Sequence, residues 1–206
     1  MNVQAAGLEG ELIVPAPATG VVIFAHGSGS SRHSPRNRYV AGMLNQGGLA
    51  TLLIDLLSAA EQTVDQQTAQ LRFDIPFLAD RLVAITRWLS HQPQAAGLKF
   101  GYFGASTGAG GALVAAADLP DLIHAVVSRG GRPDLAGDAL ERGQAPTLAI
   151  VGGADPVVLH LNRKALARLH CPNRLHIIPG AGHLFEEPGA LEDVATLARA
   201  WFAEKL

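Results

Sequence analysis

The stretch Lys99-Phe-Gly-Tyr-Phe-Gly104-Ala-Ser106-Thr-Gly108-Ala-Gly-Gly-Ala-Leu-Val-Ala115 decides how the rest of the chain is interpreted. It has the pattern of a short apolar strand, a serine framed by glycines and a helix of small residues. Gly104-x-Ser106-x-Gly108 matches a nucleophile elbow, in which a serine sits on a sharp strand-to-helix turn. Glycine on both sides allows neighbouring backbone to come close at such a strained turn. With 23 glycines in the chain the pattern alone is moderate evidence, so its weight depends on its surroundings.

Composition narrows the class of protein. The chain has 206 residues, of which 48% are hydrophobic and 17% charged, which predicts one well-buried globular domain spanning residues 1–206. The formal net charge is −2, and without a basic cluster the sequence argues against nucleic-acid binding. Cys171 is the single cysteine, which excludes an intramolecular disulfide and fits a reducing compartment.

The sequence contains no segment that is typical of membrane insertion. Residues 1–7 have neither the basic start nor the apolar core of a signal peptide. The most apolar long window, residues 47–60, is interrupted by Asp55 and is too short to span a bilayer. We therefore expect a soluble, cytoplasmic protein without a membrane partner. Its oligomeric state is left open, a homodimer included.

Strands and helices are expected to alternate along most of the chain, which predicts an α/β fold with a mostly parallel sheet and helices on both faces. A short edge strand is expected at 12–15, and residues 59–70 are interpreted as a loop, with at most a short helical piece. The remaining expected strands are 21–25, 49–54, 99–104, 125–128, 147–151 and 175–178, and the expected helices lie within 35–46, from 74 to 89, after Ser106, and at 135–142, 156–169 and 191–201.

Three residues with complementary chemistry follow three different strands. Ser106 ends the 99–104 strand, Asp155 follows 147–151 in Gly152-Gly-Ala-Asp155, and His183 follows the last strand in Gly180-Ala-Gly-His183. Ligands of open α/β sheets bind beyond the carboxyl ends of strands, so we expect these side chains to meet there. His160 is the alternative base and Asp134 the alternative acid, although Asp134 also fits a helix cap.

From about Val21 to the C-terminus, the sequence resembles the α/β-hydrolase superfamily, and within it the small, lidless branch of dienelactone-hydrolase-like proteins and carboxylesterases. Four motifs carry the resemblance together: His26-Gly27, the serine elbow, Gly-Gly-x-Asp155 and Gly-x-Gly-His183. The resemblance implies that Ser106 is the nucleophile, His183 the general base and then acid, and Asp155 the group that orients the imidazole.

The same resemblance implies an oxyanion hole made by the backbone amides of Ser28 and Thr107. One departure matters: dienelactone hydrolases proper use cysteine as the nucleophile, whereas this chain has Ser106. The serine favours ordinary carboxylic esters as substrates over dienelactone. A thioesterase or acyltransferase is the alternative within catalysis, because both use the same acyl-enzyme.

The expected substrate pocket is shallow and lacks a cap domain, because the connection from Arg129 to Pro146 is too short to build one. Loops must then wall the pocket, and the expected wall segments are residues 28–38, 56–72 and 129–142 and the segment after His183 with Leu184 and Phe185. We expect short acyl groups to be preferred. Arg129 and Arg132 face the same rim, where they would clamp a substrate carboxylate or form structural ion pairs with Asp134 or Asp138. We favour the ion pairs.

A nucleotide-binding module is the competing interpretation from another class. Gly27-x-Gly29 after a buried strand resembles a dinucleotide fingerprint, but Arg32 stands where the third glycine belongs. No P-loop motif and no metal-ligand spacing occurs in the sequence. A hydrolase fold kept only for binding is the third possibility, against which the presence of Ser106, Asp155 and His183 argues. We expect neither cofactor nor metal.

Overall fold

The computed structural model describes residues 2–5 and 7–206, and it arranges eight strands in one sheet in the order β1-β2-β4-β3-β5-β6-β7-β8. The outer pairs β1–β2 and β2–β4 are antiparallel, and every other pair is parallel. The expected α/β fold is confirmed. The strands are β1 (Asn2–Ala5), β2 (Leu8–Ile13), β3 (Gly20–Ala25), β4 (Leu49–Ile54), β5 (Lys99–Ala105), β6 (Ile123–Arg129), β7 (Thr147–Gly152) and β8 (Asn173–Ile178).

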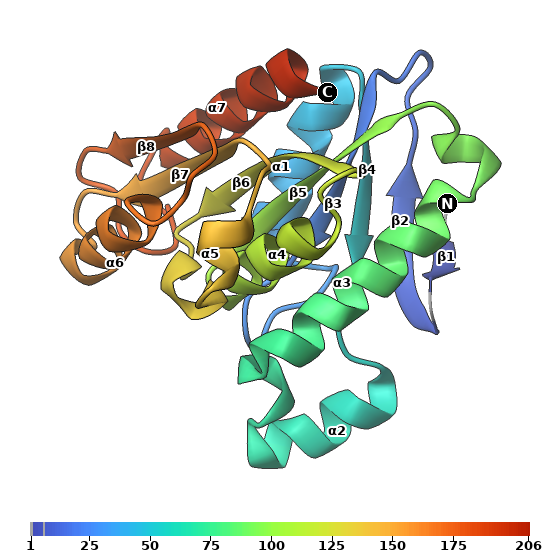
Figure 1. Cartoon of the computed structure of the whole chain (residues 1–206), viewed down its shortest axis with the longest axis horizontal. Helices are drawn as coiled ribbons and strands as arrows, with labels where there is room; N and C mark the ends of the chain where they lie inside the picture. Colours follow the sequence, from blue (N-terminus) through green and yellow to red (C-terminus); the bar gives the residue numbers. More distant parts are fainter. Residues whose placement is uncertain (1, 6) are drawn as a thin grey trace.

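Helices cover both faces of the sheet (Figure 1). Helices α1 and α7 pack together on one face, and α3 and α4 pack together on the other. The α-helices are α1 (Pro35–Gln46), α2 (Ala59–Thr68), α3 (Ile75–Ser90), α4 (Thr107–Asp118), α5 (Ala139–Arg142), α6 (Pro156–Leu166) and α7 (Ala190–Lys205), with short 3₁₀ turns η1 (Leu71–Phe73), η2 (Pro93–Ala95) and η3 (Pro133–Ala136). Among the described residues, no helix is long and apolar enough to cross a membrane.

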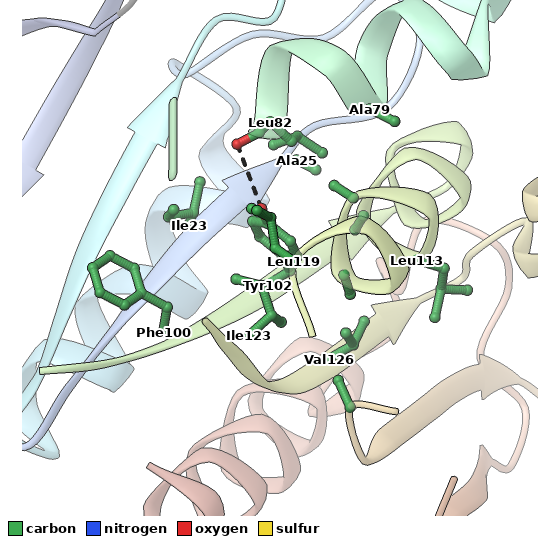
Figure 2. Packing of buried hydrophobic residues seen from close by; sticks show 14 of the residues in the cluster. Ile23, Ala25, Ala79, Leu82, Phe100, Tyr102, Leu113, Leu119, Ile123 and Val126 are labelled. Carbon is green, nitrogen blue, oxygen red and sulfur yellow. Dashed lines mark hydrogen bonds between the residues drawn. The ribbon is translucent and has the colours of Figure 1, made fainter. Parts of the chain in front are cut away.

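The sheet divides two apolar cores because successive residues of a buried strand point to opposite faces. In β3, Val21, Ile23 and Ala25 pack toward α3 and α4, whereas Val22 and Phe24 pack toward α1 and α7. Figure 2 shows the first of these cores, where the Tyr102 hydroxyl hydrogen-bonds the Leu82 carbonyl oxygen at 3.4 Å. Burial raises the pKa of Tyr102 well above its ordinary value, which keeps this phenol a neutral donor.

The expected edge strand at 12–15 was misplaced. Strand β2 covers Leu8–Ile13 and lies inside the sheet, between β4 and the outermost strand β1. Its side chains alternate: Leu8, Gly10 and Leu12 are buried, and Glu9 is exposed. The acidic residues on the outward side hide this strand from a search for continuous apolar runs.

The expected loop at 59–70 was also wrong, because residues 59–68 form the regular helix α2. Ser58 caps the helix by accepting from the Glu61 amide, and the Glu61 carboxylate accepts from the Ser58 amide at 2.8 Å. This capping box stabilises a helix start by satisfying two free amides at once. Asp65 is the single buried residue of this helix, so its sequence shows no apolar periodicity. In Figure 1, α2 projects below the body of the molecule.

The connection between β6 and β7 contains two short pieces instead of the expected single helix at 135–142. Turn η3 ends at Ala136, and Gly137, at φ 55°, separates it from α5. The helix expected at 156–169 ends at Leu166. As expected from its length, the connection builds no cap domain over the carboxyl edge of the sheet.

Candidate active site

Ser106 lies between β5 and α4 in a conformation that few non-glycine residues adopt, with φ 50° and ψ −123°. Close backbone packing imposes this turn. A Cβ on Gly104 would lie 2.5 Å from the Ala109 Cα, and one on Gly108 would lie 2.3 Å from the Ala25 carbonyl oxygen. Each flanking glycine is therefore required by a backbone contact, as the elbow pattern predicts. Such strain in a non-glycine residue is typical of functional sites.

The backbone links Ser106 to the loop that carries His183. The Ser106 amide donates to the Arg129 carbonyl oxygen at 3.3 Å, across the pair β5–β6. Gly130, which follows Arg129, adopts φ 51° and lies beside His183. A Cβ on Gly130 would lie 3.6 Å from the imidazole Nδ1 of His183. Ser106 and His183 therefore flank the same carboxyl edge of the sheet.

Asp155 and His183 are joined directly, since Nδ1 of the imidazole lies 2.8 Å from Oδ2 of the carboxylate. The other oxygen, Oδ1, accepts the amide of Val158 at 3.2 Å and so caps helix α6. Because each carboxylate oxygen has its own partner, the carboxylate plane is fixed. With Nδ1–H donating to Asp155, Nε2 is left free to accept a proton. The expected proximity of these two residues is confirmed.

The two amides expected to form an oxyanion hole lie beside each other, but one is engaged. Ser28 donates its amide to Thr107 Oγ1 at 2.9 Å, which ties the turn after β3 to the first residue of α4. Thr107 is buried, whereas Ser28 is exposed, so the bond joins a fixed acceptor to an accessible amide. The Ser28 amide therefore points at a side chain of the protein, and its role toward an oxyanion stays a prediction.

The other histidines and the alternative acid lie in different surroundings. His26 has a structural role, because its Nε2 accepts the Leu56 amide at 3.1 Å. Burial lowers the pKa of His26, which keeps the ring neutral. His160 is exposed on α6. Asp134 forms a bidentate ion pair with Arg132, with both N···O distances at 2.8 Å.

The alternative of a substrate clamp by Arg129 and Arg132 is not assembled, and the favoured ion-pair interpretation is confirmed for Arg132 but wrong for Arg129, for which the described residues show no ion pair. Arg132 is held by Asp134, which matches the favoured ion-pair interpretation. Arg129 is buried, and its guanidinium lies 5.8 Å from the centre of the Phe185 ring. Phe185 is itself 2% exposed and adopts φ 56°, so it lies in the core beneath the His183 loop, whereas Leu184 is exposed. Contrary to its expected place in the pocket wall, Phe185 is therefore almost inaccessible, and it does not line the cavity beside the turn after β3.

A cavity of about 200 Å³ opens beside the turn after β3, and two of the expected wall segments, residues 28–38 and 56–72, supply much of its lining. Leu56, Leu57 and Leu78 supply apolar surface, and Gln62, Gln66 and Arg72 supply polar groups. Asp65 holds Arg72 in place, accepting from its Nε at 2.6 Å and from its amide at 3.1 Å. The capping box Ser58-x-x-Glu61 was the signal in the sequence that could have revealed this helical wall.

The fold and the edge geometry define an α/β-hydrolase. The chain belongs to the dienelactone hydrolase family, whose model matches residues 8–205. A solved dienelactone hydrolase from Anabaena variabilis is 60% identical and superposes with a TM-score of 0.97, over 100% of this chain and 96% of that one. Est1E from Butyrivibrio proteoclasticus, solved with bound ferulic acid, shares the fold at 17% identity, with a TM-score of 0.82 over 100% of this chain and 98% of its own.

Two proteins of Mycobacterium tuberculosis are 59% identical over 197 residues, or 96% of this chain. Both are named, provisionally, as phosphoribosyl transferases. The match covers 44% of each of them, so this chain spans less than half the length of these relatives. Family and neighbouring structures together support a hydrolase.

Proposed function

We propose that this chain is a serine hydrolase that cleaves carboxylic esters through an acyl-enzyme on Ser106. One observation carries the proposal: Asp155 fixes the imidazole of His183 at the sheet edge where Ser106 stands on a strained elbow. A serine hydroxyl is a weak nucleophile until a base removes its proton, and a carboxylate that fixes the imidazole tautomer makes the imidazole an effective base.

In the proposed reaction, Ser106 Oγ attacks the ester carbonyl carbon while His183 Nε2 takes the hydroxyl proton. The imidazolium that forms is stabilised by the Asp155 carboxylate and then protonates the departing alcohol. Water, deprotonated by the same Nε2, attacks the acyl carbon and releases the carboxylic acid. Ser106 recovers its proton from His183, so the cycle needs no other reactant.

The negative oxygen of each tetrahedral intermediate needs hydrogen-bond donors. The Thr107 amide, at the start of α4, is suited to this because helix N-termini favour negative charge. The Ser28 amide can donate to the oxyanion only after its hydrogen bond to the Thr107 hydroxyl is broken. The Thr107 side chain thus keeps the second donor oriented until a substrate replaces it.

The cavity beside the oxyanion turn favours small acyl groups. Its volume of about 200 Å³ is below the range of roughly 300–1,000 Å³ that is usual for drug-sized ligands. Each methylene buried contributes about 0.8 kcal/mol, and a chain that extends beyond the cavity gains nothing further. We therefore infer that kcat/KM is flat or falls beyond a few acyl carbons.

The test combines an active-site probe with a panel of p-nitrophenyl esters of rising acyl length. A fluorophosphonate should label the wild type and Ser90→Ala, whose serine lies at the end of α3, but not Ser106→Ala. Failure to label the wild type would overturn the serine mechanism. Preference for long acyl chains would instead overturn the small pocket, and would indicate that α2 moves as a lid.

A thioesterase or an acyltransferase remains the second candidate, since each forms the same acyl-enzyme. Matched oxygen and sulfur esters, with and without an added alcohol acceptor, separate these activities. The name of the Mycobacterium relatives suggests phosphoribosyl transfer, but more than half of each relative lies outside the match. We therefore assign the serine chemistry to the matched part.

A further inference from the structure

One polar side chain beside the candidate active site is completely buried. Asn162 lies on α6 and has no exposed surface. Its Nδ2 donates two hydrogen bonds, to the Gly131 carbonyl oxygen at 2.9 Å and to the Val158 carbonyl oxygen at 2.8 Å. Carbonyl oxygens only accept hydrogen bonds, so the nitrogen of the side-chain amide, and not its oxygen, must face them.

The oxygen of the same amide is unsatisfied. Among the described residues, Oδ1 of Asn162 is buried without a hydrogen-bond partner. A buried acceptor without a partner is destabilising, which offsets much of what the two bonds from Nδ2 contribute to folding. The importance of Asn162 therefore lies in the two segments that its nitrogen joins.

The first bond holds a peptide group that also contacts the serine elbow. The Gly131 carbonyl and the Arg132 amide belong to one planar peptide group, and this amide donates to the Ser106 carbonyl oxygen at 2.9 Å. Rotation of the plane would therefore weaken the bonds to Asn162 and to Ser106 together. The Gly131 backbone is also packed closely against α4, because a Cβ on it would lie 2.6 Å from that of Ala109.

The second bond holds the helix turn that carries the candidate acid. Val158 lies in the first turn of α6, where its carbonyl oxygen accepts from Asn162 and its amide donates to Asp155 Oδ1 at 3.2 Å. The other oxygen of Asp155 lies 2.8 Å from the His183 imidazole. Asn162 thus stabilises the turn that fixes the Asp155 carboxylate beside His183.

The two halves of the site follow different strands. Ser106 follows β5 and Asp155 follows β7, and β6 lies between these two strands in the sheet. Residues 130–132 follow β6, so they lie between the two halves. Because Asn162 contacts this segment from α6, it is a side-chain link between the half with the acid and the half with the serine.

We propose that Asn162 is a positioning residue that keeps the pair of Asp155 and His183 aligned with Ser106. Under the proposed function, on which this inference rests, Nε2 of the imidazole takes the proton of the serine hydroxyl. Proton transfer requires a hydrogen-bond distance, and a misplacement of about 1 Å can lower a rate by roughly 10²-fold. Asn162 is buried and acts through its neighbours, so its loss should lower kcat and leave KM nearly unchanged.

The first test replaces Asn162 by leucine, which has a similar size but donates no hydrogen bond. Asn162→Leu should lower kcat for a short p-nitrophenyl ester by roughly 10- to 100-fold, with KM within about twofold of the wild-type value. Asn45→Leu is the matched control, because Asn45 donates to the Leu49 carbonyl oxygen and to Thr51 Oγ1 at the amino end of β4, the opposite edge of the sheet. The control should lose stability but keep its kcat.

Asn162→Thr keeps the test decisive if the leucine variant does not fold. A buried helical threonine can donate to the carbonyl four residues earlier, as Thr86 does to Leu82 at 2.8 Å. With one hydrogen to donate, threonine at position 162 would keep the bond to Val158 and lose the link to Gly131. Its kcat should therefore fall while its circular dichroism stays native. An unchanged kcat in this variant, or an equal loss of kcat in Asn45→Leu, would overturn the inference.

A double-mutant cycle with Asp155→Asn tests whether Asn162 acts through the acid. Once Asp155 no longer orients the imidazole, Asn162→Leu should lower kcat by less than about twofold more. Full additivity of the two losses would contradict the proposed route. A wild type that neither cleaves esters nor reacts with a fluorophosphonate would overturn the serine mechanism itself, and this inference with it. An active wild type whose Asn162 variants keep its kcat would overturn this inference alone.

Discussion

The two sides of the candidate site are built in different ways. On the elbow side, backbone contacts set every position: Gly104 and Gly108 allow β5, α4 and β3 to come closer than any side chain would permit. On the α2 side, the cavity wall depends on side chains, above all on the pair of Asp65 and Arg72. Under the proposed function, the nucleophile belongs to the side that backbone contacts set, and the substrate cavity belongs to the side that depends on side chains.

Removal of the nucleophile should have the largest effect. Ser106→Ala should lower kcat/KM for a short p-nitrophenyl ester by about 10⁴-fold, with the residual rate coming from the oxyanion donors. The melting temperature should stay near that of the wild type, because alanine removes only an oxygen. A loss of less than tenfold would place the chemistry elsewhere and break the comparison.

The base is tested by a matched pair of histidines. His183→Ala should lose most activity, and Asp155→Asn should do the same, because Asp155 orients the ring. His160→Ala should stay active, since that residue is exposed on α6. The opposite ranking of the two alanine variants would show that the base is His160.

Gly108→Ala tests the rigidity of the elbow side. The new Cβ would lie 2.3 Å from the Ala25 carbonyl oxygen, so β3 and α4 must separate. We expect a loss of about 1–3 kcal/mol in the free energy of unfolding, measured by urea titration. Gly42→Ala is the matched control, because its Cβ would meet nothing within 4 Å. Equal stability of the two variants would show that the elbow is not set by backbone contact.

Asp65→Asn tests the wall side. Without the carboxylate, Arg72 is released, and KM for a small ester should rise roughly fivefold while kcat changes little. Asp80→Asn, exposed on α3, should match the wild type. A fall in kcat with constant KM would assign Asp65 to the chemistry and erase the distinction between the two sides.

The same pair gives a pH dependence of stability. Burial by itself raises the pKa of Asp65, but hydrogen bonds from the amide and side chain of Arg72 and from the Leu71 amide outweigh it and hold that pKa below its ordinary value. A lowered pKa contributes stability above the unfolded value of about 3.9, and this contribution is lost as pH falls through the folded value. Acid titration of Asp65→Asn should therefore show a smaller loss of stability below about pH 4 than the wild type.

Thr107→Val should have an effect no larger than that of Asp65→Asn, because Thr107 joins the two sides through one hydrogen bond. Thr107→Val removes the acceptor of the Ser28 amide and should lower kcat/KM about fivefold, as expected for a bond worth about 1 kcal/mol. Thr107→Ser should retain nearly full activity. An increase in kcat/KM in the valine variant would show that the hydroxyl competes with the substrate for this amide.

The difference between the two sides also explains why the sequence predicted the elbow side better than the α2 side. The elbow is encoded locally, because glycines two residues on either side of Ser106 record the backbone contacts directly. The proximity of Asp155 and His183 could be predicted because the carboxyl ends of parallel strands lie at one edge of the sheet. These are geometrical consequences of strand order, so a pattern in the chain is enough to predict them.

Residues 56–72 were expected in the wall, but their helical form was missed because its signals are not periodic. Helix α2 buries only Asp65, and its partner Arg72 lies seven residues on, so no apolar pattern marks the segment. Arg129 was placed at the correct edge, but its burial under Phe185 depends on the left-handed conformation of that residue in the loop. Packing of this kind results from distant contacts, which composition and spacing do not record.

Because Asp155 makes two structural hydrogen bonds, the activity of the proposed site should depend on temperature. One oxygen holds the first turn of α6 and the other holds His183, so fraying of that turn withdraws the carboxylate from the imidazole. Helix ends open at lower free energies than the sheet beneath them. Warming should then abolish catalytic activity while most of the circular dichroism signal persists. Cooling should restore activity without any refolding of the core.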